Sequence, residues 1–232
     1  MIEVSHLSKN FYIGETKVTA VNDISLTISD GEFVSIVGRS GSGKSTFLQL
    51  IGGLAKADAG EISVDGKMLS NMTSNQLSEY RSKYIGFVFQ AFHLEPQYSV
   101  FDNVRMPLLI TGVPFKSHKE KIENALETVG IKNKINAKAA VLSGGEKQRV
   151  AIARALINNP PIILADEPCG NLDSGNSEII MELLRKMSQQ GKTVILVTHN
   201  KSDAQKTERI VEILDGKIIK DEKTNFDQRE GI

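Results

Sequence analysis

The stretch GRSGSGKST, residues 38–46, constrains the fold more than any other part of the sequence. It matches G-x-x-x-x-G-K-[ST], a loop whose N–H groups surround phosphate oxygens, whose lysine reaches the β- and γ-phosphates and whose hydroxyl binds Mg²⁺. The β-rich run EFVSIV precedes it and the helical pattern KSTFLQL follows it, which disfavours the alternative of a flexible Gly/Ser turn. The predicted phosphate site comprises Gly38, Arg39, Ser40, Gly41, Ser42, Gly43, Lys44, Ser45 and Thr46.

Around this loop, short β-rich runs alternate with helical patterns, which is typical of the α/β class. Between about Ser99 and Asn158 the patterns are almost all helical, including one with a capping box from Ser117 to Glu120. We expect a single domain over residues 1–232. Its parts are an α/β core (1–90 and 159–219), a helical insertion (91–158) and a polar, frayed tail (220–232).

Composition limits the classes of function. Lysine plus arginine equals aspartate plus glutamate at 28 each, so net charge gives no reason to expect a nucleic-acid partner. The single cysteine, Cys169, excludes an internal disulfide and fits a reducing compartment. We expect no signal peptide at MIEVSHLSKNFY, and no apolar run approaches the roughly 18 residues of a membrane-spanning helix. Any membrane association is therefore expected to come through another chain.

Polar residues follow three of the expected strands. Asp166 and Glu167 follow the apolar run IILA within IILADEP, Gln90 follows IGFVF, and His199 follows VILVT. Because ligands bind outside the carboxyl ends of strands in open α/β sheets, we expect all four side chains at the phosphate site. There, Asp166 would hold Mg²⁺, Glu167 would orient or deprotonate the attacking water, Gln90 would contact the metal or water, and His199 would hydrogen-bond the γ-phosphate. Taken singly, each has an ordinary alternative as a solvated strand-end residue.

The segment LSGGEKQRVAIARAL, residues 142–156, predicts a second anion-binding element. Ser143 and Glu146 form a capping-box pattern, and the residues from Val150 to Ile157 include the buried side of a helix. Gly144 and Gly145 in the first turn expose backbone N–H groups at the positive end of the helix dipole. A merely capped helix is the alternative.

Taken together, these motifs resemble one family over nearly the whole chain, the ATP-binding cassette ATPases that drive membrane transporters. GRSGSGKST, FVFQ, LSGGE, ILADEP, NLDS and VTH look like the Walker A, Q-loop, signature, Walker B, D-loop and H-loop sequences in the family's order. The layout is most similar to the ATPases of bacterial lipoprotein-release, macrolide-export and antimicrobial-peptide-resistance systems. The resemblance implies a P-loop NTPase (RecA-like) core with an N-terminal antiparallel β subdomain and an inserted helical subdomain.

The resemblance also implies how the two anion sites work together. In the family, two ATPase domains pack head to tail, as a homodimer or pseudo-dimer, around two ATP molecules with Mg²⁺. The signature residues of one copy, here Ser143, Gly144, Gly145 and Glu146, then face the γ-phosphate held by the other copy. Asp173 of NLDS would lie at the interface.

A membrane permease is the second partner that the resemblance implies. It would dock near Ala91 to Met106, on an apolar face of Phe92, Leu94, Pro96, Tyr98, Phe101 and Met106, and would hold the ATPase at the cytoplasmic face of the membrane. Without the resemblance, core is the more usual explanation of such an apolar face. Substrate, transport direction and the identity of the permease belong to that partner, so this sequence does not specify them.

Three positions differ from the usual family pattern. The family stacks adenine on an aromatic residue, and Phe11 fits the spacing better than Tyr12, with Val18 close by. Alternation along the strand sends Phe11 and Tyr12 to opposite faces. Glu146 stands where many members have Gln, and Cys169 stands where the subfamily has Thr or Ser, which raises the hypothesis of an oxidisable site.

Two other functions remain as alternatives. A cassette ATPase that drives a non-transport signalling or cell-division complex would have almost the same motifs. A soluble cassette ATPase of DNA repair or translation would need tandem cassettes or a long coiled coil, and this chain has neither pattern.

Overall fold

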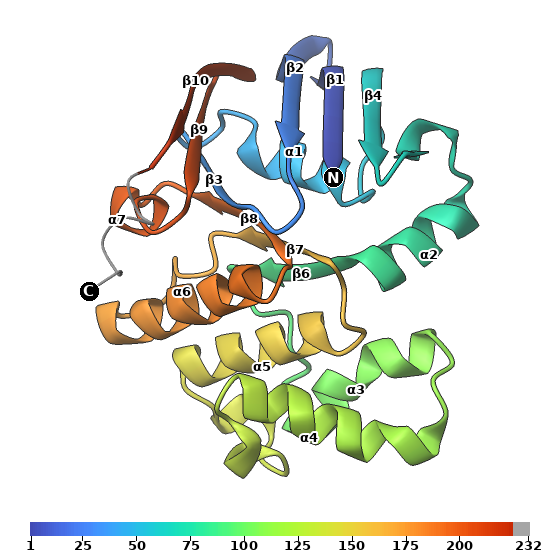
Figure 1. Cartoon of the computed structure of the whole chain (residues 1–232), viewed down its shortest axis with the longest axis vertical. Coiled ribbons are helices and arrows are strands. Elements are labelled where there is room, and N and C mark those ends of the chain that lie inside the picture. The colour runs from blue at the N-terminus through green and yellow to red at the C-terminus, as the bar shows by residue number, and fades with distance from the viewer. Residues whose placement is uncertain (225–232) are drawn as a thin grey trace.

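Two β-sheets with helices around them form the protein, of which the computed structural model describes residues 1–224. The smaller sheet is antiparallel and has the strand order β2-β1-β4-β5. It lies above α1 in Figure 1, with the central strands of the second sheet below. Its strands are β1 (Ile2–Ile13), β2 (Thr16–Ile28), β4 (Ala59–Val64) and β5 (Lys67–Met68).

The larger sheet has the strand order β10-β9-β3-β8-β7-β6, and all its neighbouring strands are parallel except β10 and β9. Its registers pair Val37 with Thr198 and Asp166 with both Val197 and Phe89. The carboxyl ends of four strands therefore meet at one edge, as expected. The strands are β3 (Phe33–Val37), β6 (Ile85–Phe89), β7 (Ile162–Asp166), β8 (Thr193–Thr198), β9 (Arg209–Leu214) and β10 (Lys217–Lys223).

Helices cover both faces of the larger sheet. One face packs on α1 and, through it, on the smaller sheet; the other packs on α5 and α6, with α3 and α4 beyond them (Figure 1). The α-helices are α1 (Lys44–Ile51), α2 (Ser74–Tyr84), α3 (Val100–Ile110), α4 (His118–Thr128), α5 (Gly144–Leu156), α6 (Ser174–Gln189) and α7 (Lys201–Ala204). Short 3-10 turns are η1 (Leu69–Asn71), η2 (Phe115–Ser117), η3 (Lys132–Lys134) and η4 (Ala139–Val141).

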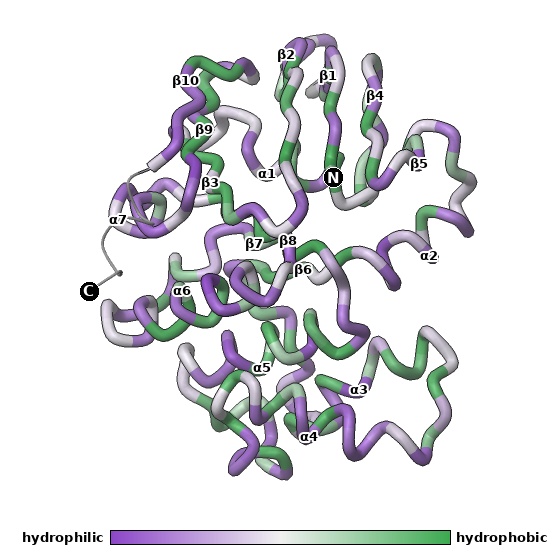
Figure 2. The backbone as a smooth tube through the Cα atoms, viewed as in Figure 1, coloured by the Kyte–Doolittle hydropathy of each residue, from purple (hydrophilic) through white to green (hydrophobic). Residues whose placement is uncertain are grey.

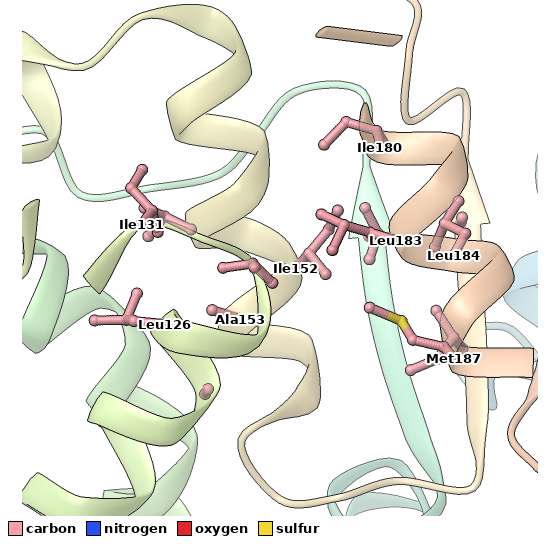
Figure 3. Close-up of a cluster of buried hydrophobic side chains, with 14 of the residues drawn as sticks. Leu126, Ile131, Ile152, Ala153, Ile180, Leu183, Leu184 and Met187 are labelled. Atoms are coloured by element: carbon pink, nitrogen blue, oxygen red, sulfur yellow. The ribbon is translucent and has the colours of Figure 1, made fainter. Parts of the chain in front are cut away.

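Two buried apolar clusters follow from this layering. Hydrophobic residues concentrate along the central strands, whereas the outer helices carry both hydrophilic and hydrophobic positions, as Figure 2 shows. Such a pattern is expected when strands are buried on both faces and helices bury only one. In Figure 3, Ile152 of α5 lies between Leu126 and Ile131 on one side and Leu183 of α6 on the other. Helix α5 thus joins the helical region to the sheet region.

The strand and helix predictions are confirmed for the elements that were proposed, but three details are wrong. The first is the capping box at Ser117. Because η2 precedes α4, Ser117 has helical backbone angles, and its hydroxyl donates to the Pro114 carbonyl (2.8 Å) instead of capping the helix.

The second wrong detail is the frayed tail from residue 220. Strand β10 continues to Lys223 and pairs with β9, because a tight turn at Asp215 and Gly216, both with positive φ, reverses the chain there. The Arg209 guanidinium holds this hairpin with two 2.7 Å bonds to the Asp221 carboxylate. Residues 225–232 of the expected tail lie outside the described residues.

The third detail is an omission, since no helix was expected at α2. A capping box begins it: Thr73 Oγ1 accepts from the Gln76 N–H, and the Gln76 side chain accepts from the Thr73 N–H. Within residues 1–224, no helix combines the length and the apolar character needed to cross a membrane.

Candidate nucleotide site

The loop between β3 and α1 has a backbone that only glycine can follow. Gly38 has φ 154°, and a Cβ atom there would lie 2.2 Å from the Ile213 carbonyl oxygen. Gly43, with φ 100°, would place a Cβ atom 1.9 Å from the Ala20 carbonyl oxygen. These two glycines are therefore required by the packing of the loop against β2 and β9, in addition to any role toward phosphate.

The backbone N–H groups in the first turn of α1 are available to a ligand. Among residues 1–224, no group accepts a hydrogen bond from the N–H groups of Lys44, Ser45 or Thr46, as is usual at a helix N-terminus. Lys44 Nζ donates to the carbonyl oxygens of Gly38 (2.9 Å) and Arg39 (2.8 Å). Burial lowers the pKa of Lys44, although the Glu167 and Asp166 carboxylates act in the opposite direction. The Lys44 ammonium and the N–H groups of this first turn thus make the loop favourable for an anion.

Ser45 and Asp166 meet across the gap between α1 and β7. Ser45 Oγ donates to Asp166 Oδ1 at 3.0 Å. Burial raises the pKa of Asp166, and the hydrogen bond from Ser45 opposes this effect. A hydroxyl and a carboxylate oxygen at this separation are the hard oxygen ligands that Mg²⁺ prefers, so these two residues fit a magnesium ion that is also bound to phosphate.

Glu167 directly follows β7 and is held by its backbone and by its side chain. Its φ is 49°, in the left-handed region, and its N–H donates to the Val197 carbonyl (2.9 Å). Its Oε1 lies 2.8 Å from His199 Nδ1, and the Thr198 hydroxyl is 3.5 Å from its Oε2. The structure therefore brings Glu167 and His199 together, as their strand-end positions predict.

Gln90 and Asp173 have partners that the sequence did not predict. Gln90 Nε2 donates to Asn171 Oδ1 (3.3 Å), and Asn171 Nδ2 donates to the Gln90 carbonyl (3.2 Å). Asp173 caps α6 by accepting from the Asn176 N–H (2.9 Å), a bond that lowers the pKa of Asp173. Asn171 is the first residue of NLDS, and only Asp173 of that motif was predicted as a site residue.

The start of α5 carries the predicted capping box. Ser143 Oγ accepts from the Glu146 N–H (3.3 Å), and the Glu146 carboxylate accepts from the Ser143 N–H (2.8 Å). A Cβ atom on Gly145 would lie 1.9 Å from Asn176 Oδ1, so any larger residue here would require the Asn176 side chain on α6 to shift. Figure 1 shows α5 and α1 on opposite sides of the larger sheet. Within one chain, the α5 start is therefore remote from the phosphate loop.

The residues predicted to stack on adenine, Phe11 and Val18, lie on the paired strands β1 and β2. Phe11 and Val18 are directly opposite cross-strand partners, both 43% exposed, so they form one apolar surface. Tyr12 is 70% exposed and pairs with Lys17. The Lys9 ammonium lies 5.6 Å from the centre of the Phe11 ring.

Cys169 lies beside Glu167 but is shielded. It is 9% exposed, lines a cavity of 390 Å³ that also contacts Glu167 and His199, and its Sγ is 3.7 Å from the Ser177 carbonyl oxygen. Burial, reinforced by the Asp203 charge, raises the pKa of the Cys169 thiol to about 12. Since the thiolate is the reactive form, this environment disfavours the oxidisable-site hypothesis.

The predicted docking stretch is only partly exposed. Leu94 and Phe101 pack against the core, while Pro96, Tyr98 and Met106 are exposed and Phe92 is half-buried. A separate groove of 330 Å³ runs between α2, β6, α3 and the end of α5. Its lining includes Arg81, Phe87, Pro107, Ile110 and Arg154. The sequence did not predict the α2 side of this groove because α2 was not predicted.

Comparisons with known proteins agree with this geometry. The family model described as ABC transporter matches residues 21–170. An uncharacterised ABC transporter ATP-binding protein of Thermotoga maritima is 43% identical, over 94% of this chain and 93% of its own. A macrolide export ATP-binding/permease protein of Aggregatibacter actinomycetemcomitans is 45% identical over 95% of this chain. The match covers 34% of that relative, so the chain spans about a third of its length.

Solved structures show the same fold. The ATP-binding cassette MJ0796, a dimer in a post-hydrolysis state bound to ADP and Pi, is 41% identical, with a TM-score of 0.89 over 96% of this chain and 98% of that chain. The cassette cbiO1 of Clostridium perfringens, part of the transporter complex cbiONQ, is 29% identical, with a TM-score of 0.87 over 99% of this chain and 90% of that chain. The P-loop NTPase fold prediction is confirmed. By sequence and by structure, the protein belongs to the ABC transporter family and is one of its nucleotide-binding ATPase domains.

Proposed function

We propose that the chain holds Mg²⁺-ATP in the loop of residues 38–46 and that Glu167 is the general base for hydrolysis. The observation that carries the proposal is the convergence of Ser45, Asp166, Glu167 and His199 at the ends of β7 and β8. The N–H groups at the α1 start and the Lys44 ammonium would bind the β- and γ-phosphates, and adenine would stack on the Phe11–Val18 surface.

Each polar group at the strand ends has a distinct task in this proposal. Ser45, Asp166 and Gln90 would hold a magnesium ion, which neutralises phosphate charge when bound. Glu167 would take a proton from the attacking water, and His199 would orient the Glu167 carboxylate and contact the γ-phosphate. The Gln90–Asn171 bond would have to open for Gln90 to reach the metal.

The active unit would be two copies of the chain, or this chain with a homologue. The α5 start has N–H groups at the positive end of a helix but no phosphate-binding loop near it in its own chain. If the α5 start of each copy faced the γ-phosphate held by the other copy, both sites would be completed at one symmetric interface. The dimeric state of MJ0796 supports this arrangement.

A membrane permease would be driven by the opening and closing of this dimer, with the ATPase at the cytoplasmic face. The groove between α2, β6 and α3 would receive a helix of the permease, next to Met106 and Ile110, which are 41% and 75% exposed. The macrolide export relatives, which combine ATP-binding and permease parts in one protein, favour an export or extrusion system of that kind. The transported substrate is not part of the proposal.

The proposal is tested by Glu167→Gln, which keeps the shape of the side chain but removes the base. We expect ATP binding to persist, steady-state turnover to fall by about 10²-fold or more, and an ATP-bound dimer to accumulate with Mg²⁺. Phosphate release and size-exclusion chromatography with light scattering measure these outcomes. Normal turnover by the variant would show that Glu167 is not the base.

A further inference from the structure

Gln148 is a buried amide at a junction between the two anion-binding elements. It lies in α5, three residues after Gly145, and is fully buried. Its Nε2 donates to the carbonyl oxygens of Phe89 (3.3 Å) and Pro168 (2.8 Å). Phe89 precedes Gln90, and Pro168 follows Glu167. One side chain therefore ties α5 to both strand ends that carry the predicted metal and base residues.

Stability alone does not account for an amide at this position. The neighbours of Gln148 along the inner side of α5, Ala151 and Ile152, are apolar and buried. Within residues 1–224, Gln148 Oε1 has no hydrogen-bond partner, and a buried acceptor without a partner is destabilising. An apolar residue would remove the unpaired acceptor but would also take this donor from the Phe89 and Pro168 carbonyls, so the amide is explained by what its N–H groups hold in place.

Further contacts make α5 and the strand ends a single unit. Gly145 packs on Asn176, whose backbone N–H is bound by Asp173. Six residues beyond Gln148 on the same helix, Arg154 donates to the carbonyl oxygens of Phe92 (2.9 Å) and His93. The chain before and after Gln90 and the residue after Glu167 are thus all hydrogen-bonded to α5. A displacement of any of these segments would move the α5 start with it.

We propose that Gln148 is a positioning residue that fixes the α5 start relative to Glu167. The helix start of one copy would then be aligned for its partner's γ-phosphate only when its own Glu167 is in place, which couples the two ATP sites of the dimer. The inference rests on the proposed function, because it needs the α5 start to act on a second copy. It adds to that function a residue that touches neither nucleotide nor metal.

The test replaces Gln148 with methionine, which has a similar length and shape but no donors. In the proposed function each ATP is bound mainly by the loop of its own chain, so we expect the KM for ATP to change less than about twofold. The turnover number should fall about tenfold, and positive cooperativity in ATP should weaken. Steady-state ATPase measurements over a range of ATP concentrations, with melting temperatures on the same samples, give all three quantities.

Thr207→Val is the matched control. Thr207 is equally buried, and its hydroxyl bonds Ser35 and the Ala204 and Arg209 carbonyls, away from the predicted site. We expect a lower melting temperature with wild-type turnover per folded molecule. Wild-type turnover and cooperativity in Gln148→Met would overturn the inference, as would an equal loss of turnover in Thr207→Val. Glu167→Gln separates the two proposals: if that variant hydrolyses ATP normally, the proposed function itself is wrong.

Discussion

At the scale of single residues, unusual backbone conformations and short polar contacts place the chemical groups. Glu167 leaves β7 with φ 49°, which turns its carboxylate toward His199 instead of continuing the strand direction. A left-handed backbone is uncommon for glutamate and is maintained only where the surrounding structure fixes it. Here the Glu167 N–H is bound to the Val197 carbonyl, so the neighbouring strand supplies that constraint.

Cys169 gives a prediction at this scale. With a pKa of about 12, less than roughly one thiol in 10⁴ is ionised at neutral pH, and the sulfur is also buried. We expect iodoacetamide at pH 7.5 to leave the native protein unmodified and fully active, and to modify Cys169 only after unfolding. Intact-protein mass and ATPase activity measure this. Rapid labelling of the folded protein with loss of turnover would contradict it.

At the scale of elements, helix starts show how far a local pattern determines structure. The Ser143–Glu146 and Thr73–Gln76 patterns form capping boxes, because each first residue has an extended backbone that frees its hydroxyl to accept. The Ser117–Glu120 pattern has the same residue types, but η2 places Ser117 in helical conformation. The conformation of the preceding turn therefore decides whether the pattern caps a helix.

This difference predicts unequal effects of removing the hydroxyls. Thr73→Ala should lower the free energy of unfolding by about 1 kcal/mol, since it leaves the first turn of α2 without its cap. Ser117→Ala should lower it by only about a few tenths of a kcal/mol, since its hydroxyl caps nothing. Urea unfolding curves with a common slope give both values. Equal losses of unfolding free energy in the two variants would show that the Thr73 and Ser117 hydroxyls do not differ in capping.

At the scale of the whole molecule, one chain contains the phosphate loop and the glycine-led start of α5 but keeps them apart. The phosphate loop precedes α1 on one face of the larger sheet, and the α5 start lies on the other side (Figure 1). Two identical surfaces related by a two-fold axis can bring the loop of one copy to the helix start of the other. Assembly, in this proposal, is what completes the site.

Mixing two inactive variants tests this arrangement. Lys44→Ala removes the loop cation and Ser143→Arg blocks the α5 start, so neither variant alone should hydrolyse ATP. A mixed dimer contains one intact site, so an equal mixture should recover up to about a quarter of wild-type turnover, since half the dimers are mixed with one intact site of two. Phosphate release from each variant and from the mixture measures this. An inactive mixture in which copurification of differently tagged variants shows mixed dimers, or full activity of Ser143→Arg alone, would contradict the in-trans proposal.

The sequence by itself determined the class of fold, the family and the order of the site along the chain. Glycine spacing, the apolar strands and the polar residue after each strand are local properties, and they follow from backbone sterics and sheet geometry. Residue types and their order along the chain therefore sufficed to place Asp166, Glu167 and His199 at the carboxyl edge of the sheet.

Only the tertiary structure decided which distant groups bind each other. The Gln90–Asn171 pair, the contact of Gly145 with Asn176, the bonds of Gln148 and the buried state of Cys169 all join segments well separated along the chain or depend on how closely elements pack. The physical reason is that a hydrogen bond or a desolvated thiol is set by distances of a few tenths of an ångström between packed surfaces. Residue types and their spacing along the chain do not define those distances.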